Sequence, residues 1–123
     1  LLEKKYEFRL FKNGIENIND VIEKLRRIMS GKVGILRDSE SLLEAKEFIE
    51  NYILNHTLYD SKEIKSKELI NMLTVAKLII NAARMRKESR GTHQRNDYPE
   101  KDDKNWHKHI IQKKDKIYYK EVE

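Results

Sequence analysis

Length, composition and charge limit this chain to one modest domain and exclude several kinds of protein. It has 123 residues, 38% of them charged and 38% apolar, and no cysteine, so one hydrophobic core is expected while disulfide frameworks and thiolate metal sites are excluded. No apolar run approaches the ~20 residues that a membrane-spanning helix needs, and we expect a cytoplasmic protein without a membrane partner.

The charge is unevenly placed along the chain. The net charge is +5, and residues 84–116 carry eleven Lys or Arg against six Asp or Glu, so this stretch accounts for the whole excess. A basic third of this kind suits either phosphate groups or an acidic partner domain. The first residues lack both an initiator Met and the apolar middle of a signal peptide, and we expect the chain to be part of a longer polypeptide.

The first third of the chain predicts a short arm and one helix. Residues 1–17 alternate weakly between apolar and charged side chains and contain an Asn13-Gly14 turn signal, which predicts an extended N-terminal arm. Apolar residues then recur at helical spacing after an N-cap at Asn19 or Asp20. This helix is expected to stop at Ser30-Gly31.

A second helix follows a short apolar connector. The connector, residues 32–38, is expected to pack inward, and Asp38 or Ser39 can cap the helix that begins there. One face of this helix is an apolar stripe and the opposite face is rich in Glu and Lys, as expected for a helix with one side in water.

The third predicted helix, from about Ser66 to Ser89, is apolar around most of its circumference. Two short helices can cover only part of such a surface, so the remainder predicts a partner, either a larger parent protein or a second copy of the chain. Gly91 is placed to end the helix in the left-handed conformation.

The C-terminal residues predict a β-hairpin, with strands at 107–112 and 116–122 around Lys113-Lys114-Asp115. The expected fold is therefore all-α, a spectrin-repeat-like three-helix bundle followed by a loop and a short hairpin. We expect three parts: an arm at 1–17, the bundle at 18–90, and a basic loop with the hairpin tail at 91–123.

The loop after the third helix is the main candidate site. Arg90 and Arg95 can each bind a carboxylate through two hydrogen bonds. They could form a seam with another domain, pair locally with Glu88, Asp97 and helix-end carbonyls, or contact a ligand directly. The residues of the candidate interdomain seam are Glu88, Ser89, Arg90, Gly91, His93, Arg95 and Asp97.

Other kinds of site have weaker support in the sequence. His107 and His109 with His93 lack an obvious further metal ligand. Ser89, His93 and Asp97 lie four residues apart across a helix end and a loop, which is not a nucleophile elbow. The four glycines fit no nucleotide-binding fingerprint. We therefore predict no catalytic, cofactor-binding or metal-binding residue in this chain.

Nucleic-acid binding is a rival from another class. Aromatic residues stand among the basic ones and could stack on bases, namely Tyr98, Trp106, Tyr118 and Tyr119. Acidic residues are interspersed through the same stretch, however, and no known recognition motif is present. We predict no nucleic-acid partner.

Three stretches of the sequence carry distinctive motifs. Residues 28–38 contain Met-x-x-x-Val-Gly-Ile-x-Arg. Residues 68–73 lead to 83–91, which end in Glu-Ser-Arg-Gly. Residues 93–109 continue with His-x-Arg-x-Asp and then Asn-Trp-x-Lys-His. Together they resemble the C-terminal region of the succinate dehydrogenase and fumarate reductase flavoprotein superfamily, and the first is similar to a segment of L-aspartate oxidases, which belong to it.

The resemblance implies a C-terminal helical domain packed beside the flavin-binding and capping domains of a parent enzyme. Val33-Gly34-Ile35 favours L-aspartate oxidase, which uses FAD to convert L-aspartate to iminoaspartate for NAD biosynthesis. Asn105-Trp106-x-Lys108-His109 favours the alternative, a fumarate reductase or succinate dehydrogenase flavoprotein. Either way FAD and the catalytic residues belong to the other domains, so the fragment alone is expected to be inactive, although it could self-associate.

Overall fold

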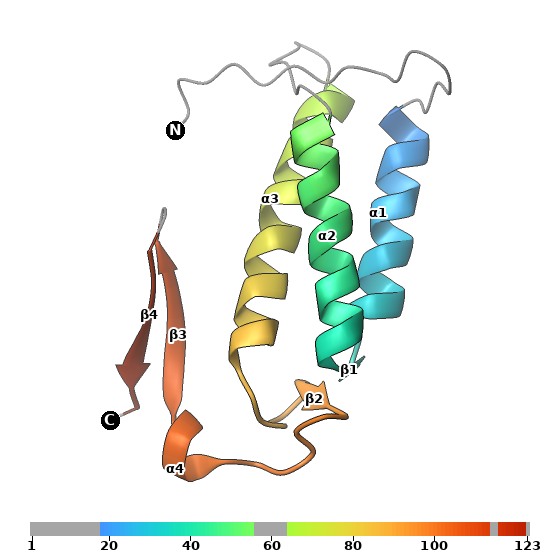
Figure 1. Cartoon of the computed structure of the whole chain (residues 1–123). Helices are drawn as coiled ribbons and strands as arrows, with labels where there is room; N and C mark the ends of the chain where they lie inside the picture. Colours follow the sequence, from blue (N-terminus) through green and yellow to red (C-terminus); the bar gives the residue numbers. More distant parts are fainter. Residues whose placement is uncertain (1–17, 56–63, 114–115, 123) are drawn as a thin grey trace.

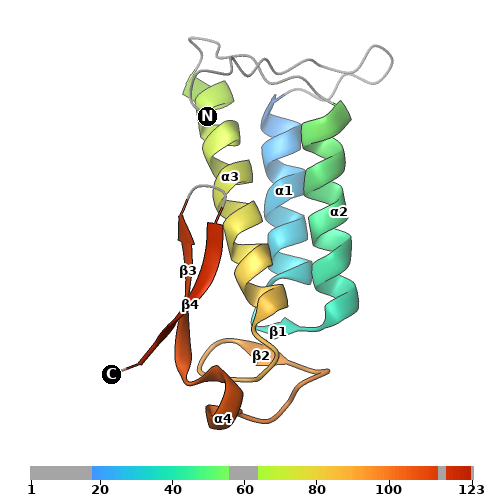
Figure 2. The same ribbon diagram turned by 60° about the vertical axis from the view of Figure 1, so that its left-hand side comes forward.

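The computed structural model describes residues 18–55, 64–113 and 116–122, so the predicted arm at 1–17 lies outside the described residues. In the described part three long helices lie side by side and each contacts the other two (Figures 1 and 2). Four short strands and a four-residue helix accompany them. The elements are α1 (Ile18–Lys32), β1 (Leu36–Arg37), α2 (Ser39–Asn55), α3 (Ile64–Met85), β2 (Gln94–Arg95), α4 (Asp103–Trp106), β3 (Lys108–Lys113) and β4 (Lys116–Glu121).

The core lies between the three long helices and is formed by apolar side chains at helical spacing. Leu25 of α1, Leu42 and Ile49 of α2, and Leu69 and Ile80 of α3 are each almost completely buried. Burying a Leu or Ile side chain contributes roughly 1.5–3 kcal/mol, so these contacts are what hold the helices together. Within the described ranges, no helix combines the length and apolar character needed to cross a bilayer.

The starts of the first two helices differ in how well they were predicted. α1 already begins at Ile18, so Asn19 and Asp20 lie in its first turn, and the N-cap predicted there is wrong. The helix also continues past the predicted stop at Ser30-Gly31 to Lys32. For α2, the Asp38 carboxylate accepts a hydrogen bond from the Ser41 backbone N–H at 2.8 Å, which confirms Asp38 as a cap.

The connector between α1 and α2 does not pack inward throughout, as the sequence suggested. Val33 is buried, but Ile35 and Leu36 are 65% and 68% exposed. Leu36–Arg37 forms β1, which pairs in parallel with Gln94–Arg95 of β2. This pairing takes the backbone of the connector out to the loop, so the prediction was wrong for two of its apolar side chains and the all-α prediction missed a strand pair.

The third helix ends at Met85, four residues before the predicted end at Ser89. Gly91 does have a positive φ of 58°, but it is not the residue that ends the helix. It lies in a tight turn in which Arg90 and His93 exchange backbone hydrogen bonds of 2.7 and 3.0 Å. The left-handed glycine was correctly predicted, and its position relative to the helix was wrong.

The predicted hairpin is present as β3 and β4, with its first strand shifted by one residue. The strands are antiparallel and Lys108 pairs with Glu121 at one end and Lys113 with Lys116 at the other. The hairpin runs beside the second half of α3 (Figures 1 and 2). The Gln112 side-chain amide donates a hydrogen bond of 2.8 Å to the Leu78 carbonyl and fixes it there.

Candidate functional site

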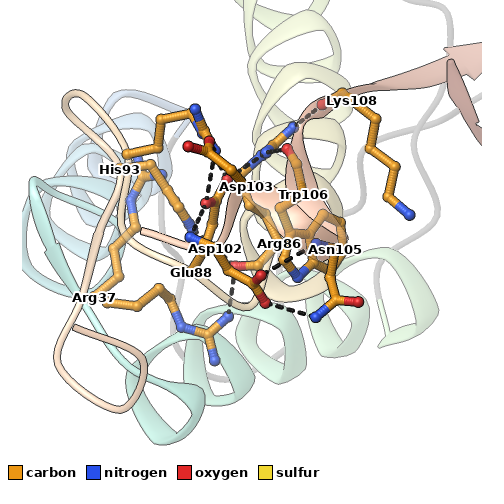
Figure 3. A network of polar contacts seen from close by, with 11 residues as sticks. Arg37, Arg86, Glu88, His93, Asp102, Asp103, Asn105, Trp106 and Lys108 are labelled. Carbon is orange, nitrogen blue, oxygen red and sulfur yellow. Dashed lines mark hydrogen bonds and ion pairs between the residues drawn. The ribbon is translucent and has the colours of Figure 1, made fainter. Parts of the chain in front are cut away.

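A buried carboxylate lies at the centre of the loop that follows α3 (Figure 3). The Glu88 side chain is completely buried. Its Oε1 accepts hydrogen bonds from Arg86 Nη1 at 2.6 Å and Arg90 Nε at 2.8 Å. Its Oε2 accepts from Arg90 Nη2 at 3.1 Å and from the Asp102 backbone N–H at 2.8 Å. A buried anion with this many donors is stable as the charged form.

Arg86 connects this carboxylate to the hairpin. Besides Glu88, its guanidinium donates to the Trp106 carbonyl at 3.0 Å and to the Lys108 carbonyl at 2.6 Å. The same group lies 5.4 Å from the centre of the Trp106 ring, and that ring packs edge-on against Tyr119 with centroids 5.6 Å apart. These contacts place α4 and the start of β3 relative to the end of α3.

A second ion pair joins the loop to two helix ends. The Arg95 guanidinium binds Asp97 through two hydrogen bonds of 2.8 and 2.6 Å. Its Nη1 donates to the Ala83 carbonyl at 3.0 Å, at the negative end of the α3 dipole. Asp97 in turn accepts hydrogen bonds from the Ser39 backbone N–H and hydroxyl, at the positive end of α2. The pair therefore ties the C-terminus of α3 to the N-terminus of α2.

His93 and Ser89 complete the internal bonding of the loop. His93 Nε2 lies 2.9 Å from the Arg86 carbonyl and Nδ1 lies 2.8 Å from Arg37 Nη1. Since a carbonyl only accepts and a guanidinium only donates, the ring is neutral with its proton on Nε2. The Ser89 hydroxyl donates to the Tyr98 carbonyl at 2.8 Å and accepts from the Arg95 backbone N–H at 2.9 Å.

The electrostatics of the loop follow from these bonds. Burial raises the pKa of Glu88, but hydrogen bonds from Arg90, Asp102 and Arg86 outweigh it and lower the pKa to about 2. Hydrogen bonding to Arg95 likewise holds the pKa of Asp97 well below its ordinary range. Burial, together with the nearby guanidinium charges, lowers the pKa of His93. The loop is thus a set of charges already compensated from within the chain.

The seam residues predicted from sequence lie together, but they face one another. Both arginines follow the alternative of local pairing, Arg90 with Glu88 and Asp103, and Arg95 with Asp97. Ser89, His93 and Asp97 each bond to a different partner and do not form a triad. Among the described residues no group of three or more potential ligands could hold a metal ion.

This loop does not fit the pyrophosphate of a flavin nucleotide. Such a group needs several unpaired N–H donors in a glycine-rich turn or at a helix N-terminus. Here the donors of Arg86, Arg90 and Arg95 are directed at carboxylates and carbonyls of the chain itself. Gly91 lies in a tight turn and not in a phosphate cradle.

Besides Arg86, sequence reasoning left three residues from other parts of the chain out of the cluster, namely Arg37, Ser39 and Asp103. Each contacts a predicted seam residue from a distant part of the chain, namely His93, Asp97 and Arg90. Arg37 does belong to a stretch that carried the family resemblance, which was a usable signal. Asp103 likewise lies in the third of these stretches, and Ser39 was marked only as a possible cap of the second helix.

One side of α3 carries exposed apolar side chains, which confirms the prediction that two short helices cover this helix only in part. We call this side the uncovered flank of α3. Val75, Leu78 and Ile79 are 53%, 40% and 41% exposed. Val75 and Ile79 line an open groove of about 670 Å³ between α3 and α1, whose walls also include Leu25 and Met29. In this part of the structure α1 and α2 leave one side of α3 uncovered.

Comparison with known proteins places this arrangement in a family. Residues 22–123, which include most of α1, all of α2 and α3, the ion-pair loop and the hairpin, match the family described as fumarate reductase flavoprotein C-term. The chain belongs to this family.

Several relatives support the assignment to the fumarate reductase flavoprotein C-terminal family. The chain is 35% identical over 108 residues to a fumarate reductase flavoprotein subunit of Helicobacter pylori strain J99. This match covers 80% of the chain and 15% of the Helicobacter protein. It is 37% identical over 111 residues to an uncharacterized FAD-dependent oxidoreductase of Methanocaldococcus jannaschii, and this match covers 87% of the chain and 20% of that protein. An L-aspartate oxidase of Streptomyces coelicolor is 30% identical over 94 residues, and this match covers 71% of the chain and 16% of that protein.

A solved structure shows the same fold within a longer chain. The E245Q mutant of the FrdA chain of Escherichia coli quinol fumarate reductase matches with a TM-score of 0.67 and 25% identity, over 92% of this chain and 22% of that one. This C-terminal family domain therefore spans only about a fifth of its relatives' length. The predicted superfamily is confirmed, and fumarate reductase and succinate dehydrogenase names are more frequent among the similar proteins than L-aspartate oxidase.

Proposed function

We propose that this chain is the C-terminal domain of an FAD-dependent enzyme of the fumarate reductase and succinate dehydrogenase type. In it the domain has a structural role, and binding of FAD and of the dicarboxylate belongs to the rest of the polypeptide. The observation that carries the structural role is the loop in which Glu88, Arg90, Arg95 and Asp97 neutralise one another. Charges engaged in this way are not available to a substrate carboxylate, but they hold a loop rigid.

The predicted seam belongs to this proposal. Because its charges are paired internally, the segment 88–97 would meet the flavin-binding and capping domains with a preformed backbone and with exposed groups such as Asn96 and Tyr98. The groove beside Val75 and Ile79 would be covered in the parent, which is proposed to be cytoplasmic. Because a rigid loop loses little conformational entropy on docking, less of the favourable binding free energy of the seam would be cancelled.

L-aspartate oxidase is the second candidate, and it is favoured by the resemblance of Val33-Gly34-Ile35 to a segment of those enzymes. The Val33-Gly34-Ile35 segment that resembles those enzymes includes a glycine whose absent side chain is needed, because a Cβ on Gly34 would lie 2.7 Å from the Ser30 carbonyl oxygen. The local structure therefore depends on this part of the motif. The relative from Streptomyces coelicolor carries this second name.

The test uses the full-length protein that contains this chain. We expect it to copurify with FAD and to interconvert succinate and fumarate; L-aspartate-dependent formation of iminoaspartate with no succinate activity would establish the second candidate. The isolated chain is expected to bind no FAD and to turn over neither substrate. A stoichiometric yellow complex of the isolated chain would overturn the structural role.

A further inference from the structure

The hairpin has two faces of different character. Residues directly opposite in an antiparallel pair share a face, and faces alternate along each strand. Tyr119 packs against Trp106, and Gln112 bonds to the Leu78 carbonyl, so the face that holds both is turned toward α4 and α3. Ile110, opposite Tyr119, and Ile117, opposite Gln112, belong to the same face.

The other face is basic and points away from these contacts. The register places three pairs on it: His109 with Lys120, Ile111 with Tyr118, and Lys113 with Lys116. We call these six residues the basic face. All of them except Ile111 are exposed, Tyr118 to 46%, and the described residues of this face include no carboxylate. Since like charges directly opposite each other destabilise a strand pair, the Lys113–Lys116 pair costs the hairpin stability.

The same hairpin also leaves backbone groups unpaired. In the described part of the chain β4 pairs with β3 alone, so the N–H and C=O groups of its outer edge have no strand partner. All six residues of β4 are exposed. An exposed strand edge is a template for a further strand. In the described residues, one face of the hairpin therefore carries positive charge without a carboxylate, and the outer edge of β4 carries backbone groups without a strand partner.

We infer that the basic face and the outer edge of β4 are the docking surface for an acidic, extended segment of the parent polypeptide, outside this chain. This inference rests on the proposed function, because it requires a parent. Carboxylates would offset the charge of Lys113, Lys116 and Lys120, and the backbone of the segment would pair with the edge. A segment of the same polypeptide is favoured because the chain spans only about a fifth of its relatives' length, and a covalent connection keeps such a segment at a high effective concentration.

Other occupants satisfy fewer of these features. A second copy would bring its own Lys113, Lys116 and Lys120 against the first, so like charges would meet. A nucleic acid would neutralise the lysines and could stack on Tyr118, but phosphates cannot donate hydrogen bonds to the carbonyls of a strand edge. Lysines can also serve simply to keep an edge strand from aggregating, and the experiment separates this role from docking.

Hydrogen exchange of the hairpin amides, compared between the isolated chain and the full-length flavoprotein, tests the inference. We expect the β4 amides to exchange at least about tenfold more slowly in the full-length protein. Lys116→Glu should have opposite effects in the two settings. In the isolated chain it replaces a repulsive pair with Lys113 by an attractive one and should slow exchange, whereas in the full-length protein it repels the acidic segment and should speed exchange.

Lys77→Glu makes the same change of charge on the exposed side of α3 and should leave β4 exchange unchanged in both settings. Equal protection of β4 in the two proteins, or the same sign of the Lys116→Glu effect in both, would overturn the inference. Aggregation as the sole effect of Lys116→Glu would also overturn it.

A photo-reactive residue at position 118 identifies the occupant. Cross-linking of the full-length protein to an acidic peptide of the same polypeptide is the expected result. A cross-link only to a second copy, to another protein or to nucleic acid would refute the inference. FAD content and dicarboxylate turnover of the same samples report on the proposed function, so the two can fail separately.

Discussion

Replacing Glu88 by Gln tests whether the buried carboxylate stabilises the fold through its charge. The substitution keeps the size of the side chain but removes the charge that Arg86 and Arg90 bind at 2.6 and 2.8 Å. Removing one partner of a buried ion pair typically costs about 3–5 kcal/mol. Lowering the pKa from 4.5 to about 2 corresponds to about 3.5 kcal/mol at roughly 1.4 kcal/mol for each tenfold change in the proton equilibrium. Because Arg86 and Arg90 are partly exposed, we expect about 3 kcal/mol at neutral pH.

Urea unfolding of the isolated chain at a series of pH values measures this effect. Since the pKa of Glu88 is lower in the folded state, its contribution is complete above 4.5 and is lost as the pH falls toward about 2. The difference in free energy of unfolding between the wild type and Glu88→Gln should therefore shrink over this range. Glu47→Gln, on the exposed side of α2, should change stability by less than about 0.5 kcal/mol. A difference below 1 kcal/mol at pH 7 for Glu88→Gln, or one that does not change with pH, would refute the reasoning.

Three further predictions concern glycine, histidine and the uncovered flank. Gly34→Ala should cost about 1–3 kcal/mol, because its Cβ would lie 2.7 Å from a backbone oxygen, whereas Gly31→Ala, with nothing within 4 Å, should be neutral or slightly stabilising in chemical denaturation. The lowered pKa of His93 should make wild-type stability fall as the pH drops below 6.5, and His93→Asn should lose this dependence in the same assay. Val75→Ser should change the stability of the isolated chain by less than about 0.5 kcal/mol, whereas Leu73→Ala, at a position 2% exposed, should cost about 2–5 kcal/mol in thermal or urea unfolding.

The parts of the fold that could be predicted from sequence are those with a repeating local signal. Helical spacing of apolar residues indicated the three long helices, and two alternating segments around a polar turn indicated the hairpin. The pairing of β1 with β2 had no such signal, because each strand has two residues and they lie more than fifty positions apart. The end of α3 was missed for a related reason. Residues 86–89 have ordinary helical propensity, but Arg86 and Glu88 bond to the loop and the hairpin instead of extending the helix.

For the candidate site, sequence reasoning identified the residues but left their partners open. The pairings of Arg90 with Glu88 and of Arg95 with Asp97 were among the alternatives because these residues are close in sequence. The bond from Ser39 to Asp97 could not be anticipated, since it depends on where the start of α2 meets the loop. The seam with other domains stays a prediction, because its partner surfaces belong to the parent protein.

The buried Glu88 carboxylate orients its neighbours, and this role explains its burial better than a contribution to stability alone. An apolar side chain in its place could fill the same volume, and such replacements of buried ion pairs are often neutral or stabilising. It could not, however, accept the directed hydrogen bonds that fix the Asp102 backbone at the start of α4 or hold the Arg86 guanidinium in line with the Lys108 carbonyl. These two bonds set where α4 and the hairpin leave the helices. A domain that must present its hairpin to another part of a larger protein needs that angle to be fixed, and an ion cluster with specific geometry provides it.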